Sequence, residues 1–131
     1  MAQYNLLPIY KSAYDFLMRI MYVVNRFPKN YKFSVGEKLQ NAAIDIVLDI
    51  YRANSAHDKT GYIKSLLDKV QILYLLLRVA CDIKILPVNS YADIIITVDD
   101  IAKQAQGWLK NSNYLNKKIN EKVPEPVNTT V

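Results

Sequence analysis

Apolar residues recur every three or four positions in several stretches of the chain, a spacing that predicts amphipathic helices. In residues 6–26 the apolar positions fall on one arc when successive residues are placed about 100° apart. Pro28 is expected to end this helix, because proline lacks the amide hydrogen that a continuing helix needs. The arc consists of Ile9, Ala13, Phe16, Ile20, Val23, Val24 and Phe27.

The stretch RFPKNYKFSVGEKLQNAA, residues 26–43, separates this helix from the next one. Ser34 and Glu37 have the spacing of a capping box, in which the serine hydroxyl and the glutamate carboxylate bind free backbone N–H groups. A second helix is therefore expected to begin at Ser34 or Val35. The polar stretch NSAHDKTG, residues 54–61, is expected to end it.

A third helix is expected over residues 60–86, because Pro87 disfavours helical geometry at the residue before it. Ser90 is expected to cap a fourth helix, with Asp93 three positions later. The apolar pattern fades beyond Asn111, and the ending EKVPEPVNTTV offers little to bury. We therefore expect residues 1–111 to form the folded domain and residues 112–131 to form a disordered tail.

Four helices with short connections predict an all-α fold, an antiparallel up-down four-helix bundle. Apolar residues make up 51% of the chain, whereas glycine occurs only 3 times and proline 5 times, which argues against many short strands and turns. The length of 131 residues suits one domain with a substantial core.

The predicted helix over residues 60–86 carries a second apolar stripe, roughly opposite its core-facing arc. A helix in a small bundle normally buries one stripe, and a large exposed apolar patch usually marks an interaction surface. We therefore expect homo-oligomerisation; the alternative is that this helix is central and covered on both sides by its neighbours. The second stripe consists of Ile72, Leu75, Leu76, Val79, Ile83 and Leu86.

No group of residues has the pattern of a catalytic or metal site. His57 is the only histidine and lies in a polar connector. Two aspartate pairs, Asp45 with Asp49 and Asp99 with Asp100, lack the histidine partners of a carboxylate metal bundle and are interpreted as solvated faces. We therefore expect no catalytic residues, no metal and no cofactor.

Localisation is expected to be cytoplasmic. The single cysteine, Cys81, excludes an internal disulfide and fits a reducing compartment. The N-terminal stretch MAQYNLLPIYKSAYDF lacks the pattern of a secretory signal, and charged residues interrupt each later apolar segment before it is long enough to cross a bilayer. We expect no membrane partner.

Positive charge is in excess, with 17 lysines and arginines against 12 acidic residues. Basic residues follow the polar side of the first predicted helix and continue into the connector beside Tyr22, Tyr31 and Phe33. Such a strip is able to neutralise phosphates and stack unpaired bases; the alternative is a solvated charged surface. The strip consists of Lys11, Arg19, Arg26, Lys29, Lys32 and Lys38.

Arg78 lies between the two apolar stripes in the segment LLLRVACDIKIL, with Lys84 following in the same segment. An arginine edged by apolar surface either extends to solvent or meets an acid or phosphate at an interface. We favour the interface for both residues.

Three segments resemble the accessory variability determinant (Avd) proteins of diversity-generating retroelements. These are FPKNYKFSVGEKLQNAAIDIVLDIYRAN, LLLRVACDIKIL and VDDIAKQAQGWLK. The same segments resemble, more broadly, four-helix proteins encoded in intervening sequences of bacterial large-subunit rRNA genes. The similarity extends over about residues 6–111.

The resemblance implies a non-catalytic four-helix bundle that assembles as a ring-like homopentamer. Avd-like proteins bind the element's reverse transcriptase and its template RNA, and the complex copies a template repeat into error-containing cDNA during mutagenic retrohoming. Positively charged residues are implicated in binding these partners. In this sequence the corresponding positions are Arg26, Lys29, Lys32, Lys38, Arg52, Arg78 and Lys84.

Three functional hypotheses follow. The first is a retroelement accessory subunit that binds reverse transcriptase and RNA or an RNA–cDNA hybrid. The second is an rRNA- or ribosome-associated bundle without a polymerase partner, and the third is a purely structural oligomerisation module. Helix periodicity does not separate the first two, whereas the genes that surround this one would.

Overall fold

The computed structural model describes residues 3–122, and every regular element among them is helical. A short 3-10 helix, η1, comprises Tyr4–Leu6 and precedes α1. The connector to the second long helix contains a single turn, α2, and a π-helix, η2. The remaining bounds are α1 Pro8–Asn25, α2 Lys29–Tyr31, η2 Lys32–Gly36, α3 Glu37–Ser55, α4 Thr60–Asp82 and α5 Val88–Lys122.

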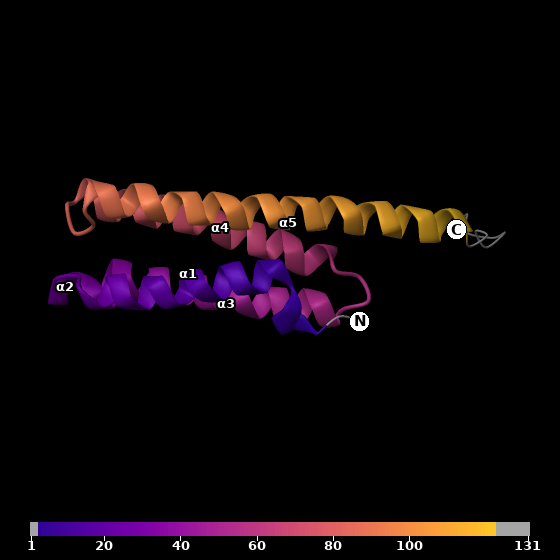
Figure 1. The fold of residues 1–131 in the computed structure, drawn as a ribbon, viewed down its shortest axis with the longest axis horizontal. Coiled ribbons are helices and arrows are strands. Elements are labelled where there is room, and N and C mark those ends of the chain that lie inside the picture. Colours follow the sequence, from indigo (N-terminus) through magenta and orange to yellow (C-terminus); the bar gives the residue numbers. More distant parts are fainter. Residues whose placement is uncertain (1–2, 123–131) are drawn as a thin grey trace, which may run out of the picture.

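The four long helices run up, down, up and down (Figure 1). Helix α1 packs beside α3 and α5, and α4 packs beside the same two helices from the other side. This arrangement confirms the prediction of an all-α fold and has the layout of a four-helix bundle.

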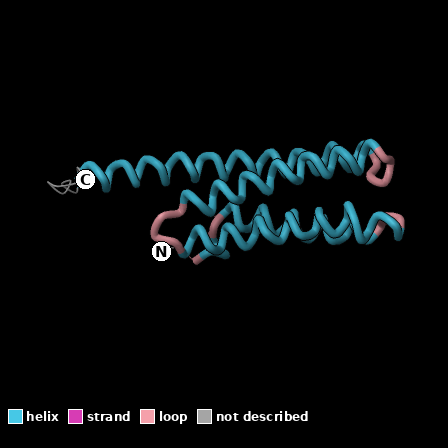
Figure 2. The backbone as a smooth tube through the Cα atoms, turned by 180° about the vertical axis from the view of Figure 1, so that it is seen from behind, coloured by secondary structure: helices cyan, strands magenta, loops and turns pink. Residues whose placement is uncertain are grey.

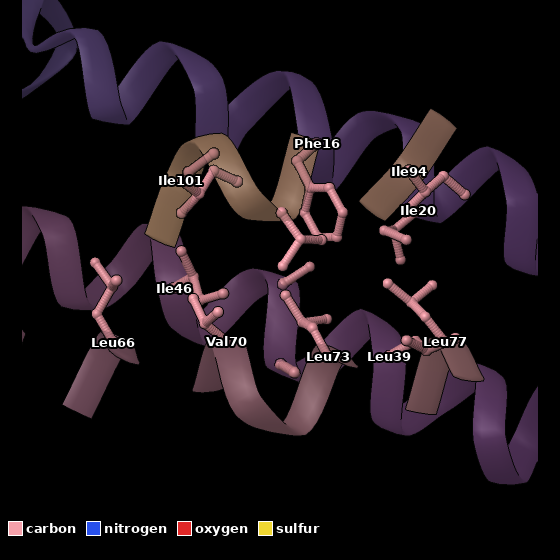
Figure 3. Packing of buried hydrophobic residues seen from close by; sticks show 14 of the residues in the cluster. Phe16, Ile20, Leu39, Ile46, Leu66, Val70, Leu73, Leu77, Ile94 and Ile101 are labelled. Carbon is pink, nitrogen blue, oxygen red and sulfur yellow. The ribbon is translucent and has the colours of Figure 1, made fainter. Parts of the chain in front are cut away.

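The core lies along the axis between the four helices, as Figure 3 shows. Phe16 and Ile20 from α1 point toward Leu73 and Leu77 from α4, and all four side chains are fully buried. Burial of each such side chain contributes about 1.5–3 kcal/mol to stability. The arc predicted for the first helix is confirmed, except that Val23 is only half-buried.

The second long helix begins differently from the prediction. Helical geometry starts at Lys29, directly after Pro28, whose carbonyl accepts hydrogen bonds from the N–H groups of Tyr31 and Lys32. Ser34 lies inside this helical run, and its hydroxyl is 3.4 Å from the carbonyl oxygens of both Asn30 and Tyr31. The predicted capping box is therefore wrong, because the chain re-enters a helix before it reaches Ser34.

The π-helix η2 depends on a close approach to α1. A Cβ atom added at Gly36 would lie 2.6 Å from Cγ1 of Val24 and 3.2 Å from the carbonyl oxygen of Tyr31. Only glycine leaves room for this contact. On the other side of the same turn, the side chain of Phe33 is 74% exposed. The wide π turn thus places Gly36 against α1 and leaves Phe33 at the surface.

The connector between α3 and α4 is held by two polar side chains. The Lys59 ammonium donates to the carbonyl oxygens of Ala53, Asn54 and Ala56, at 3.0, 3.1 and 3.1 Å, and so caps α3. The carboxylate of Asp58 accepts hydrogen bonds from the Thr60 N–H and hydroxyl and from the Asn116 amide. These bonds, above all the one from the Thr60 backbone, lower the pKa of Asp58. The connector therefore also anchors α5.

Helix α4 ends at Asp82, earlier than expected. Lys84 has a φ of 66°, and the N–H groups of Lys84 and Ile85 donate to the carbonyls of Cys81 and Ala80. This is the Schellman pattern of a helix end, with lysine in the position that glycine usually occupies. Leu86 follows in the connection and is buried in the core.

Helix α5 begins at Val88, immediately after Pro87, and continues to Lys122. Ser90 therefore lies within the first turn, and its predicted role as the cap is wrong. The expected end near Asn111 also differs from the structure, and α5 extends beyond the end of the bundle (Figures 1 and 2). Of the predicted tail, residues 123–131 lie outside the described part of the chain. The division into a domain and a tail stays a prediction.

Asp49 forms a polar link between α3 and α4. Its side chain is buried; it accepts a 2.8 Å hydrogen bond from the Ser65 hydroxyl and lies 3.6 Å from both Lys69 Nζ and Arg52 Nη1. The prediction that Asp49 faces solvent is therefore wrong. Its partners come mostly from another helix, which sequence periodicity on α3 alone does not reveal.

Replacing Gly36 with alanine tests the close approach of η2 to α1. The added methyl group would overlap Val24, so we expect the Gly36→Ala protein to lose about 1–3 kcal/mol of unfolding free energy in urea titration. Gly107 on α5 is the control, since an added Cβ there meets nothing within 4 Å. Gly107→Ala is expected to stabilise the protein by about 0.5–1 kcal/mol. Equal effects of the two substitutions would contradict the account.

Candidate nucleic-acid interface

One end of the bundle gathers basic side chains from several segments. The last turns of α1 meet the connection between α4 and α5 there, since Arg19 and Arg26 line the same pocket as Ile85 and Ser90. Helix α2 and η2 continue from the same end of α1 (Figure 1). We call this region the basic end and define it by Arg19, Arg26, Lys29, Lys32 and Lys84.

The arginine pocket, with a volume of about 400 Å³, lies between α1 and the α4–α5 connection. Arg19, Tyr22, Arg26 and Ser90 supply its polar groups. The Arg26 guanidinium lies over the Tyr22 ring, 4.9 Å from its centroid, and its Nη2 donates to the Tyr22 hydroxyl at 3.0 Å. Arg26 is therefore held in place by a neutral partner, which leaves its charge unneutralised.

The charge around the arginine pocket is largely positive. Arg19 Nη2 lies 3.9 Å from the exposed carboxylate of Asp93, a long contact at the surface that contributes little. Helix α5 begins at Val88 beside the pocket, whereas α1 and α4 end near it, so the helix dipoles oppose one another and the positive charge comes from the two guanidinium groups. Two arginines, a tyrosine hydroxyl and a serine hydroxyl are together suited to binding a phosphate group.

A second concavity, the Phe33 groove, lies between α1, η2 and the start of α3, with a volume of about 850 Å³. Phe33 and Tyr22, 74% and 63% exposed, supply aromatic surface to it. Tyr22 therefore borders both the groove and the arginine pocket. The remaining lining includes the methionines Met18 and Met21, the amides Asn25, Gln40 and Asn41, and the charged residues Lys32 and Glu37.

Two predicted binding residues lie away from the basic end. Lys11 is exposed near the start of α1, about 12 Å along the helix axis from Arg19. Arg52 lies in the last turn of α3, at the opposite end of the bundle, where it pairs with the buried Asp49. Of the strip expected from the sequence, Lys11 thus lies apart from Arg19, whereas Arg52, which the family resemblance added, lies at the opposite end of the bundle.

Lys38 and Arg78 occupy other surfaces. Lys38 lines a groove of about 290 Å³ between α3 and α4, together with Asp45 and Lys69. Arg78 is exposed on α4, and its Nε donates to both carboxylate oxygens of Asp82, at 3.1 and 3.2 Å. This hydrogen bond raises the pKa of Arg78, so the side chain is charged but already paired with an acid.

The second apolar stripe of α4 is largely at the surface. Ile72, Leu75 and Ile83 are exposed, Leu75 to 64%, whereas Leu76 and Val79 are half-buried. Neighbouring helices therefore do not cover α4 on both sides. Leu86 belongs to the core instead of the stripe, because the chain leaves α4 at Asp82 and turns inward. The α4 stripe, as named from here, consists of Ile72, Leu75, Leu76, Val79 and Ile83.

Several residues of this region were not predicted from the sequence as binding residues. Met18, Asn25, Gln40 and Asn41 line the Phe33 groove, and Ser90 lines the arginine pocket. Met18 lies one turn from Tyr22 on the solvent-facing side of α1. An apolar residue on the polar side of the first predicted helix is the signal that could have pointed to it. Gln40, Asn41 and Ser90 reach this region only through the packing of α3 and α5 on α1.

Across residues 3–122, no three histidine, cysteine or acidic side chains lie where they could hold a metal ion. No helix in the same range combines the length and the apolar character needed to cross a membrane. The surface of the described residues instead offers a basic end with two concavities and an exposed apolar stripe. This combination is typical of a helical binding protein.

The chain belongs to the bAvd-like family, whose model matches residues 7–112. This match spans all of α1, α3 and α4 and most of α5. It confirms the resemblance to the Avd proteins, which form a family of non-catalytic accessory proteins. The search of curated proteins finds no match to this chain.

Proposed function

We propose that this protein is a non-catalytic accessory subunit of a diversity-generating retroelement. In this role it assembles as a ring-like homopentamer in the cytoplasm and binds the element's reverse transcriptase together with template RNA or an RNA–cDNA hybrid. The bound complex supports mutagenic retrohoming. Membership of the bAvd-like family over residues 7–112 is the observation that carries the proposal.

The basic end supports an RNA contact. Arg19 and Arg26 line one pocket, and Lys29, Lys32 and Lys84 lie on the segments around it. Of these five residues only Arg19 has an ion pair in the described part of the chain, and that pair is long at 3.9 Å. Unpaired cations are the ones able to exchange bound counterions for phosphate groups. Arg52 and Arg78 already pair with acidic side chains, so we expect them to contribute less to RNA binding.

The α4 stripe supports self-association. Three of its members, Ile72, Leu75 and Leu76, line a groove. The same groove contains Lys38, Asp45 and Lys69, so an apolar centre has charged groups at its edge. Protein interfaces commonly combine a desolvated apolar centre with a polar rim. Ile72, Leu75 and Ile83 of the stripe are exposed in the single subunit, so these side chains are able to contact another copy without a change in the fold.

A charge placed in the α4 stripe should break the oligomer. We expect Leu75→Glu to convert the assembly to a monomer in sedimentation velocity, because a carboxylate cannot be buried there without a partner. Ile96→Glu, which alters an exposed isoleucine on α5, is the control and should leave the assembly intact. A wild-type protein that remains monomeric at micromolar concentration would contradict the oligomer.

RNA binding through the basic end should depend steeply on salt. Each phosphate contact that is lost lowers the slope of log affinity against log salt by about 0.7 for a single strand. The double variant Arg26→Ala, Lys29→Ala should therefore lower the slope by up to about 1.4. Lys64→Ala removes an exposed charge from the other end of the bundle and should leave the slope unchanged.

Co-expression with the neighbouring genes decides between the retroelement role and its alternatives. A reverse-transcriptase gene and a template repeat beside this gene, with co-purification of the polymerase, would support the proposal. A position inside an rRNA gene and retention on ribosomes would favour the rRNA-associated bundle. If the protein binds neither RNA nor polymerase at low salt, the hypothesis of a purely structural oligomerisation module would be favoured.

A further inference from the structure

The Phe33 groove has the composition of a site for an unpaired base. Phe33 and Tyr22 offer flat aromatic surface, and every base has a π face able to stack on such a ring. The amides of Asn25, Gln40 and Asn41 supply donors and acceptors within the same groove. No hydrogen bond involves these amide side chains within residues 3–122, so they are available to the edges of a base.

Charge separates the groove from the arginine pocket. Glu37 lines the groove, and its carboxylate opposes a phosphate there but is able to accept a hydrogen bond from a base N–H group. The arginine pocket has no acidic residue in its lining and carries Arg19 and Arg26. The two concavities therefore favour different parts of one ligand: the apolar and amide-lined groove takes the base, and the pocket takes the phosphate.

Tyr22 joins the two sites. It lines the groove and the pocket, and Arg26 is attached to it by the cation–π contact and by the 3.0 Å hydrogen bond to its hydroxyl. A strand that stacks a base beside Tyr22 would thus have its backbone next to Arg26. A base within a duplex is paired and stacked on its neighbours, so only an unpaired one is free to enter the groove.

We propose that the Phe33 groove and the arginine pocket together hold an unpaired nucleotide segment, with a base stacked in the groove and a phosphate between Arg19 and Arg26. This inference rests on the proposed nucleic-acid binding. It specifies where on the protein the nucleic acid binds and that the bound segment is single-stranded. The π-helix η2 has a direct role here, because it presents Phe33 and Lys32 to the groove while Gly36 packs on Val24.

Phe33→Ala in the full-length protein tests the groove. The probe is a short single-stranded RNA with a fluorescent base analogue at one internal position, compared with a duplex of the same length. We expect Phe33→Ala to weaken single-strand binding about tenfold and to abolish the fluorescence quench that stacking produces, because one base–aromatic stack is lost. Duplex affinity should not change.

Tyr62→Ala is the matched control, since Tyr62 is an exposed aromatic at the other end of the bundle, and it should leave both signals unchanged. Single-stranded DNA of the same sequence shows which kind of strand the site binds. Equal affinities for DNA and RNA would mean that the site accepts both the cDNA and the template RNA. Tighter binding of RNA would identify the template RNA as the ligand. Either result supports the proposed site if Phe33→Ala weakens binding of the strand that the wild-type protein binds.

The two proposals fail in different ways. If the wild-type protein binds a single strand and Phe33→Ala binds it equally well with the same quench, the groove is not the site although nucleic-acid binding stands. Tighter binding of the duplex than of the single strand would also overturn the inference. If the wild-type protein binds neither probe at low salt, the proposed RNA contact itself is wrong and the inference falls with it.

Discussion

The contact between Gly36 and Val24 is the constraint on which the candidate site depends. Because Gly36 has no Cβ, the wide turn of η2 is able to close against α1, where an added Cβ would lie 2.6 Å from Val24. This closure keeps the connector short and leaves Phe33 at the surface beside Tyr22. A groove for binding is thus formed by packing of the connector on the end of the bundle.

The surface divides into regions with different chemistry. The basic end offers cations and aromatic rings from α1, η2 and the α4–α5 connection, whereas α4 exposes a stripe of aliphatic side chains. An oligomer formed through the α4 stripe would repeat the basic end once in each subunit, so the strand-binding sites would become multivalent. Linked sites of modest affinity bind one long strand much more tightly than a single site does. Self-association and nucleic-acid binding would therefore reinforce each other.

Periodicity predicted the helices well because it reports which face of each helix meets the core. It placed the start of α4 at Thr60 and identified buried residues such as Phe16 and Ile20. Local signals were less informative where the rest of the fold decides the geometry: Ser34 resembles a cap, but the helix starts at Lys29. For the candidate site, the binding role of the basic residues stays a prediction. Sequence reasoning did not foresee their separation, since Arg52 and Arg26 lie at opposite ends of the bundle. Gln40 was missed, and Ser90 was considered only as a helix cap, because helix packing alone brings them to the candidate site.

We propose that nucleic acid binds at the basic end of the bundle. Ultraviolet crosslinking of a single-stranded RNA, followed by mass spectrometry of the crosslinked peptides, tests it most directly, because aromatic rings stacked on bases crosslink efficiently. Crosslinks are expected at Tyr22 and Phe33 and should disappear at high salt. Crosslinks concentrated at the opposite end, around Tyr51 and Tyr62, with none in residues 19–36, would contradict it.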